Sequence, residues 1–291
     1  MSDYLLRIFA KEAGVRAIAC TIPQLTQEAH ERHKTKAIAT VALGRALAGG
    51  VLMGAILKVR QEVALKFEGD GPLGKIIIEA DSNGIVRGYI AHPEVDWPPM
   101  VHGFEVSKAV GRNGLLTVVK DLRLKELYQG SVPLVSGELD EDLAYYLAQS
   151  EQIPSLVGAG TVVDDSGRVT AAGGVLIQSV PPHNPETIAL LSGRLAEMPP
   201  IAELFRAGQT PETFLAELFG TIQYQTLESC PVRFRCSCSR ERAEQALISL
   251  GADDLGDLLA SEGKAEIDCH FCREHYLFEA ADLQRLIALS Q

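Results

Sequence analysis

The sequence predicts an α+β protein, in which an N-terminal antiparallel-sheet core domain with helices is followed by a helical linker and a small C-terminal four-cysteine zinc-binding domain. Three observations predict this order. Alternating β-like runs separated by Gly-containing turns dominate residues 1–179, apolar positions recur at helical spacing in residues 180–230, and four of the six cysteines lie in residues 231–291. A chain of 291 residues is long enough for one large domain and one smaller domain.

Two short β-like runs begin the chain, at residues 4–10 and 15–22, and the Gly-containing turn between them predicts a hairpin. Pro23 then begins a predicted helix that continues to about Lys34, because proline is well tolerated in a first helical turn. A longer helix is expected over residues 37–58. Its small residues would allow close packing against a sheet or another helix; these are Gly44, Ala48 and Gly49.

Several residues of this region invite functional interpretations that the sequence does not favour. Cys20 is alone in a predicted strand, which is typical of a small core residue. His30 and His33 lie on one predicted helix, but zinc needs three or four ligands and no third is nearby, so we expect surface positions. The apolar run at residues 37–57 contains Arg45 and four glycines, which favours a buried helix over a membrane span.

From Glu62 onward the apolar residues alternate, which predicts a β-meander and further strands. The Gly-rich segment at residues 69–74 lacks the Gly-Lys-Ser/Thr ending of a phosphate loop and lies between strands, so we interpret it as a turn. Residues 92–99 form a Pro-rich loop that contains the only tryptophan, Trp97. Strands are expected at residues 63–68, 75–80, 85–91, 115–121 and 131–136, and a closing hairpin at residues 155–164 and 168–180.

A helix is expected to begin after residue 136. Ser136 or Gly137 would cap it, and its first turn carries Glu138, Asp140 and Glu141, which suit the positive end of a helix. This position explains the carboxylates without acid–base chemistry, so we assign no catalytic residue.

A Pro-rich stretch at residues 180–185 marks the end of the core domain. Short helices are predicted over residues 186–198, 201–207 and 211–219. Their apolar residues recur at helical spacing and must be buried, and the preceding domain is the obvious surface. On pattern alone they form an ordinary helical subdomain. The apolar residues are Ile188, Leu191, Leu195, Leu204, Phe205, Phe214, Leu215, Leu218 and Phe219.

The C-terminal region contains two close cysteine pairs, Cys236 with Cys238 and Cys269 with Cys272, separated by residues 239–268. Zinc prefers four tetrahedral ligands, and each short pair can supply two thiolates, so folding back the intervening segment would complete a four-thiolate site. Such a site has no open position for substrate and is structural or regulatory. The alternatives fit less well. Core cysteines usually occur singly and not in close pairs, and secreted proteins held together by disulfides contain more cysteine for their length than this chain does. Helices are expected near residues 240–250 and 253–261 and after Phe278.

The pair Cys236 and Cys238 also suggests redox chemistry, because a disulfide across one intervening residue is strained and easily reduced. Oxidation of the four thiolates to two disulfides would release the metal. Flanking arginines either favour the thiolate or form a solvated face, and the sequence leaves both open; they are Arg233, Arg235, Arg240 and Arg242. His270 and His275 are expected to be neighbours of the site and not ligands.

The joint pattern resembles the 33 kDa chaperonin family, the bacterial redox-regulated heat-shock chaperones with a zinc-thiolate switch, over nearly the whole chain. The resemblance is carried by residues 231–239 (Pro-Val-Arg-Phe-Arg-Cys-Ser-Cys-Ser), the Cys-His-Phe-Cys motif at 269–272 and Tyr-Leu-Phe at 276–278. Upstream it extends to residues 136–146, 150–154 and 172–178.

The resemblance implies a chaperone that is inactive when reduced, with one zinc ion on Cys236, Cys238, Cys269 and Cys272. Oxidative stress would form the disulfides Cys236–Cys238 and Cys269–Cys272, release zinc, unfold the linker and free apolar surface for unfolding client proteins, with homodimer formation on activation. Cys230 lies outside the family's four-cysteine pattern; it is either inert or able to divert oxidation into another pairing.

Two alternative functions, a nucleic-acid-binding adaptor and an enzyme, are disfavoured by the charge and the motifs of the chain. The net charge of −11, and the balance of 7 basic against 11 acidic residues from Pro231 onward, disfavour binding to nucleic acid, and hence a zinc-ribbon adaptor for nucleic acid or a transcription partner. We find no nucleophile–base pair or phosphate loop that would indicate an enzyme such as a hydrolase. Reduced, paired cysteines, with no N-terminal signal and no membrane segment, indicate a cytoplasmic protein.

Overall fold

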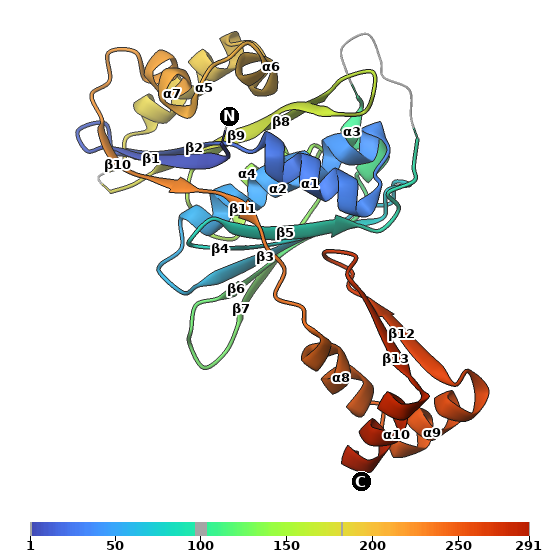
Figure 1. The fold of residues 1–291 in the computed structure, drawn as a ribbon. Coiled ribbons are helices and arrows are strands. Elements are labelled where there is room, and N and C mark those ends of the chain that lie inside the picture. The colour runs from blue at the N-terminus through green and yellow to red at the C-terminus, as the bar shows by residue number, and fades with distance from the viewer. Residues whose placement is uncertain (1, 97–103, 182, 291) are drawn as a thin grey trace. The chain divides into compact units, whose positions relative to one another are not determined.

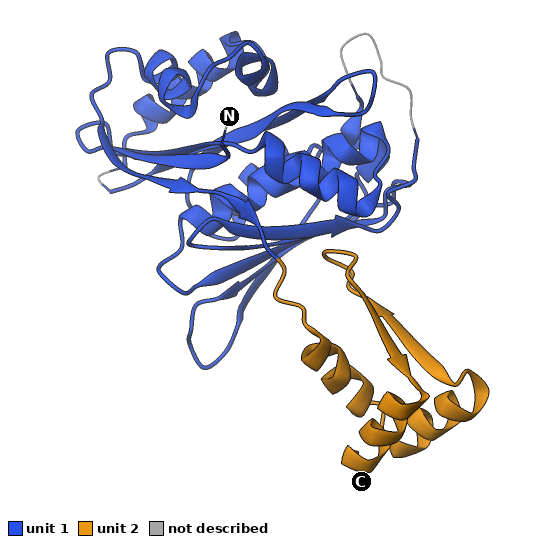
Figure 2. Ribbon diagram, viewed as in Figure 1, with its two compact units in different colours: residues 1–235 blue, residues 236–291 orange. Residues whose placement is uncertain are grey.

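The computed structural model describes residues 2–96, 104–181 and 183–290. Their contacts divide the chain into two compact units, Met1–Arg235 and Cys236–Gln291 (Figure 2). Residues 97–99 of the predicted Pro-rich loop, with Trp97, lie outside the described residues. The second unit begins five residues after the predicted position, Pro231, because the chain before Cys236 pairs with strands of the first unit. The division into core, linker and zinc-binding domains stays a prediction.

The first unit contains a five-stranded antiparallel sheet, sheet A. Two hairpins, β1–β2 and β8–β9, form it as the sequence predicts, because their buried positions face two separate apolar clusters. An unpredicted strand, β10, pairs with the outer edge of β1. The order is β10-β1-β2-β9-β8, with β10 (Gln225–Pro231), β1 (Tyr4–Ala10), β2 (Val15–Thr21), β9 (Val169–Ser179) and β8 (Ser155–Val163) (Figure 1).

A second sheet of six strands, sheet B, contains the predicted meander. The strand predicted at residues 131–136 begins at Tyr128 and ends at Pro133, because its register with β6 pairs Tyr128 with Lys120 and Pro133 with Leu115. The order is β11-β5-β4-β3-β6-β7, with β11 (Arg233–Phe234), β5 (Ile85–Ile90), β4 (Lys75–Asp81), β3 (Glu62–Glu68), β6 (Leu115–Asp121) and β7 (Tyr128–Pro133).

Helices α1 (Pro23–His33) and α2 (Ala37–Ala55) lie between the two sheets (Figure 1). In α2, 89% of the most apolar 18-residue window is buried, so the apolar run is a core helix, as predicted. The predicted close packing is also present, since a Cβ atom on Gly44 would lie 2.7 Å from Cγ2 of Thr26.

Two predictions for α1 and α4 (Leu139–Gln149) are wrong. His33 is buried and His30 hydrogen-bonds Thr35 and Thr40, so neither histidine is the expected surface residue; α1 presents this side to α2. The N-cap of α4 is Glu138, with no side-chain capping bond, in place of Ser136 or Gly137.

The carboxylates at the start of α4 hold the local structure together. The Asp142 carboxylate accepts hydrogen bonds from the backbone N–H groups of Val135, Ser136 and Gly137, and so turns the chain into the helix. Glu138 forms an ion pair with Arg45. A short unpredicted helix, α3 (Val106–Val110), precedes β6.

The predicted linker helices pack on the outer face of sheet A (Figure 1). They are α5 (Pro185–Glu197), α6 (Ile201–Arg206) and α7 (Pro211–Phe219). Their apolar stripes are buried against the preceding domain, as expected, and form a second core with β1, β2 and β9. Its buried members include Leu191, Phe205, Phe214 and Phe219 from the helices and Leu6, Ile8, Val175 and Ile177 from the strands.

The second unit has a small core of its own, which includes Leu255, Phe278, Leu283 and Leu286. All three helices expected there are present, together with an unpredicted hairpin. The elements are α8 (Arg240–Ile248), α9 (Ala252–Ser261), β12 (Lys264–Asp268), β13 (His275–Glu279) and α10 (Ala280–Leu289).

Candidate metal centre

Four cysteine sulfurs gather in the second unit. The Sγ atoms of Cys236, Cys238, Cys269 and Cys272 all lie within 4.8 Å of one another. Cys236 and Cys269 are 3.7 Å apart at sulfur, and Cys238 and Cys272 are 3.2 Å apart. Tetrahedral zinc with Zn–S bonds of about 2.3 Å requires sulfurs about 3.8 Å apart, so the cluster is compact enough to hold such an ion. Within the described part of the chain, it is the one group of three or more His, Cys, Asp or Glu side chains placed closely enough to hold a metal ion.

Local structure explains how each pair reaches the cluster. Cys236 and Cys238 immediately precede α8, whose N-cap Ser239 accepts a hydrogen bond from the Arg242 backbone N–H. Cys269 and Cys272 lie in the turn between β12 and β13. That turn is closed by bonds from Cys269 N to Glu274 O (2.9 Å) and from Arg273 N to Cys269 O (2.8 Å). A hairpin turn therefore supplies one pair and a helix entry supplies the other.

The side chains around the sulfurs form hydrogen bonds of their own. The Tyr276 hydroxyl lies 3.2 Å from Cys238 Sγ and donates to it. Arg242 donates to the Ser237 hydroxyl at 2.8 Å, and Arg240 stacks over Phe278 with its guanidinium carbon 4.3 Å from the ring centre. Arg240 and Arg242 thus support the framework of the site.

Burial acts on the titration of two of the four sulfurs. It raises the pKa of the Cys269 and Cys272 thiols. A bound divalent cation favours the thiolates, because its charge offsets the cost of a buried thiolate and the protons are released on binding.

Neither neighbouring histidine belongs to the cluster. His275 places Nδ1 2.8 Å from the Asp268 carboxylate, across the β12–β13 hairpin. The metal-ligating group contains cysteines alone, and the expectation that His270 and His275 are not ligands stays a prediction.

The two remaining cysteines lie in the first unit. Cys20 is fully buried in the core, as predicted, and burial raises its pKa to about 12. Cys230 lies in β10 opposite Leu5, half-buried, with its thiol donating to the Asn83 carbonyl at 3.4 Å.

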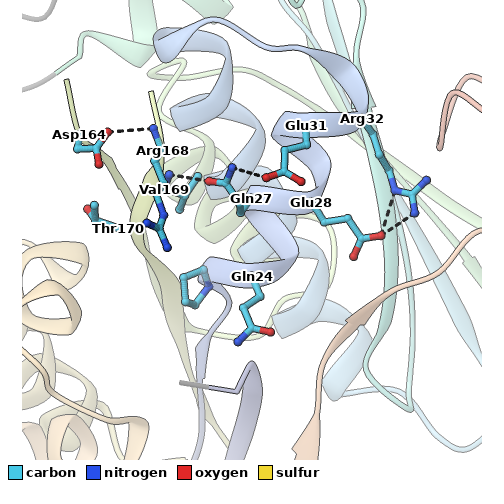
Figure 3. Close-up of a pocket in the computed structure, with 10 residues that line it drawn as sticks. Gln24, Gln27, Glu28, Glu31, Arg32, Asp164, Arg168, Val169 and Thr170 are labelled. Atoms are coloured by element: carbon cyan, nitrogen blue, oxygen red, sulfur yellow. Dashed lines mark hydrogen bonds and ion pairs between the residues drawn. The ribbon is translucent and has the colours of Figure 1, made fainter. Parts of the chain in front are cut away.

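A hollow lies on the first unit between α1 and the β8–β9 turn (Figure 3). Its polar side chains bond one another: Arg32 pairs with Glu28, and Gln27 bonds both Glu31 and the Val169 backbone N–H. The one hydroxyl among the described lining residues, that of Thr170, donates to the Val162 carbonyl oxygen at 3.2 Å and not to a neighbouring carboxylate.

Comparisons with known proteins extend these findings. A family model described as "Hsp33 protein" matches residues 3–279. The 33 kDa chaperonin of Geobacter sulfurreducens is 50% identical over 286 residues, covering 98% of this chain and 95% of that protein. The 33 kDa chaperonin of a Geobacillus species is 45% identical and covers 100% of this chain and 99% of that protein. The crystal structure of the 33 kDa chaperonin of Thermotoga maritima has a TM-score of 0.91 at 35% identity, covering 98% of both chains.

Proposed function

The chain belongs to the Hsp33 family and is a redox-regulated chaperone, and on that premise we propose that its metal is a single zinc ion. In the reduced protein, Cys236, Cys238, Cys269 and Cys272 would bind it as thiolates. The observation that carries the proposal is the gathering of all four sulfurs within 4.8 Å. Hsp33 is a family of chaperones, which is not a class of enzymes.

Zinc would contribute much of the stability of the second unit. That unit has only seven buried apolar residues in its core cluster, and a domain this small usually needs a metal or disulfides to fold. The free energy of binding structural zinc, roughly 10–16 kcal/mol in small peptides, is at the same time folding free energy. Loss of the metal would therefore destabilise the unit.

Oxidation would remove the metal by consuming its ligands. We propose the pairs Cys236–Cys238 and Cys269–Cys272. Two equivalents of a peroxide take up the four electrons lost by four thiolates, forming two S–S bonds and reducing both peroxide O–O bonds to water or alcohol, while Zn²⁺ leaves. A closed four-thiolate site has no position for substrate, so its chemistry is the release of the ion.

Loss of zinc would expose apolar surface on the first unit. Helices α5–α7 cover the outer face of sheet A with side chains such as Leu191 and Phe214. We propose that this linker region undocks after zinc is lost, that unfolding client proteins bind the freed surface, and that the activated chain forms a homodimer in the cytoplasm. No nucleic acid or membrane partner is proposed.

The test follows client aggregation and metal together. Reduced protein should contain one zinc ion per chain, and peroxide with mild heating should release it while light scattering from a denaturing client falls. The matched control is the same protein kept in thiol reductant at the same temperature. Unchanged aggregation after measured zinc loss would refute the proposal.

A further inference from the structure

A single segment closes the edges of both sheets. Residues 225–235, here called the strap, pair first with β1 as β10, at the edge of sheet A, and then with β5 as β11, at the edge of sheet B. Figure 1 shows it leaving α7 and running along both sheets. Without the strap, β1 and β5 would be edge strands with unpaired backbone groups.

The strap is attached mainly through its backbone. Every side chain of β10 is exposed except that of Cys230, which is half-buried. Val232 is the one buried side chain of the strap. Backbone bonds run from Val232 N to Asp3 O (3.0 Å), from Arg233 N to Gly84 O (2.9 Å) and from Arg235 N to Val86 O (3.1 Å).

Within the described residues, the one side-chain ion pair between β1 and β10 joins Arg7 to the half-exposed Glu228, so the edge holds its strand mainly through backbone bonds and selects its sequence only weakly. Main-chain pairing supplies affinity in strand addition, whereas side-chain pockets supply specificity. The β1 edge pairs with a strand whose side chains are nearly all exposed to solvent. It is therefore suited to extended polypeptide of almost any sequence.

Both ends of the strap depend on structures that oxidation would remove. Its N-terminal end follows α7 by a short connection, and Cys236 directly follows its C-terminal end. Ordering eleven residues costs backbone entropy, and the side chains that offset this cost are few: Val232 is buried, and Cys230 and Phe234 are partly buried against the core. The strap should therefore leave the sheets once α5–α7 and the cysteine cluster no longer restrain it.

We propose that the β1 edge, once the strap has left it, is a client-binding site to which an extended segment of unfolding protein adds as a β-strand. In the reduced protein the strap occupies this edge as an internal substitute for the client. Leu6 and Ile8 of β1 point to the face that α5–α7 cover, so an added strand also meets newly exposed apolar surface. The inference rests on the proposed redox activation.

The test uses the full-length oxidised protein and two peptides. One is a Val/Thr-rich extended peptide as long as β1; the other has the same sequence with its central residues N-methylated, which removes backbone donors on both edges but keeps the side chains. We expect affinity to fall at least about tenfold on N-methylation, because several backbone bonds are lost. Reduced, zinc-loaded protein should bind neither peptide, since the strap occupies the edge.

Amide hydrogen exchange locates the site. Exchange of residues 3–9 should accelerate on oxidation and slow again when the unmodified peptide is added. Oxidised protein that suppresses aggregation but binds both peptides equally, or leaves residues 3–9 unprotected, would overturn the edge site while the chaperone function stands. Oxidised protein that does not suppress aggregation would refute the function itself. Protection that returns without peptide and depends on protein concentration would identify a second copy's strap as the occupant and overturn the proposal.

Discussion

Arg235 donates its backbone N–H to the carbonyl oxygen of Val86 at 3.1 Å, and the next residue in the chain is Cys236. The last hydrogen bond of the strap to sheet B is therefore one residue away from the first sulfur of the cluster. The segment that closes both sheets and the first cysteine pair are thus contiguous in the sequence.

The ligand set can be tested by serine substitution. Replacing Cys269 and Cys272 with serine removes two of four thiolates, and zinc binding should fall by at least about 100-fold, measured by competition with a chromogenic chelator. Cys230→Ser is the matched control, because that thiol lies outside the cluster and bonds Asn83. Equal zinc loss in the control would show that the ligand set is wrong.

Tyr276→Phe should weaken the metal site without removing a ligand. The Tyr276 hydroxyl donates to Cys238 Sγ at 3.2 Å, and partners of this kind orient and stabilise a metal-binding thiolate. Zinc affinity should fall about tenfold in the same competition assay, with far-ultraviolet circular dichroism unchanged. An unaltered affinity would mean that the hydroxyl does not support the thiolate.

Arg194→Ala should loosen the linker helices. The Arg194 guanidinium on α5 donates to the last carbonyls of α7, those of Leu218 (3.0 Å) and Phe219 (2.6 Å). Losing these charged bonds should cost about 2 kcal/mol in the stability of the docked helices. Less peroxide should then activate the protein, measured as the dose that halves client aggregation, while zinc affinity stays constant.

The control for this change is Arg206→Ala. Arg206 is half exposed and pairs only with Glu203 three residues away, so its removal should change stability by less than about 0.5 kcal/mol. If both variants need the same peroxide dose, the bond between α5 and α7 does not restrain activation.

Val232→Ala should free the strap in reduced protein. Val232 is buried in the main core, and removing two methyl groups should cost about 1.5 kcal/mol. Amides of residues 225–235 should exchange faster, whereas zinc content should not change. Leu227→Ala is the matched control in the same strap, because 57% of Leu227 is exposed. Equal exchange in both variants would mean that Val232 does not anchor the strap.

The stability of the first unit should depend on Cys20 at high pH. Burial raises the Cys20 pKa from 9.0 to about 12, so the folded state favours the neutral thiol. This contribution is fully present below about pH 9 and is lost as pH rises toward 12, at up to about 1.4 kcal/mol per pH unit. Cys20→Ala removes it. The difference in urea midpoint between the two proteins should therefore shrink from pH 8 to pH 10.5; a constant difference would contradict the raised pKa.

The sequence predicted most helices and strands because their burial follows a regular period. The strands at residues 63–68 and 75–80 alternate, and the linker stripes repeat at helical spacing, so each element carries its own signal. The four cysteines were equally accessible to prediction, since their spacing reflects the ligand requirement of zinc. The wrong expectation for His33 has a simple cause: its burial depends on where α2 packs, which the sequence of α1 does not contain.

The strap escaped prediction for a physical reason. β10 exposes both faces, so it has no alternation, and its pairing is dictated by the free edge of β1. Hairpin β12–β13 is different, because Ala265 and Ile267 alternate with polar residues in β12, and Tyr276 and Phe278 lie on one side of β13 with Leu277 on the other. That signal was present and could have placed the second cysteine pair in a hairpin turn.

The burial of α2 bears on the highest temperature at which the protein can act as a chaperone. Nineteen residues of almost purely apolar helix would, if uncovered, make the chaperone a substrate for aggregation alongside the proteins it protects. The two sheets that enclose α2 must outlast the parts that oxidation disassembles. The thermal stability of the two sheets and α2, more than the sensitivity of the cysteine cluster to oxidation, should then set the highest temperature at which the protein still prevents its clients from aggregating.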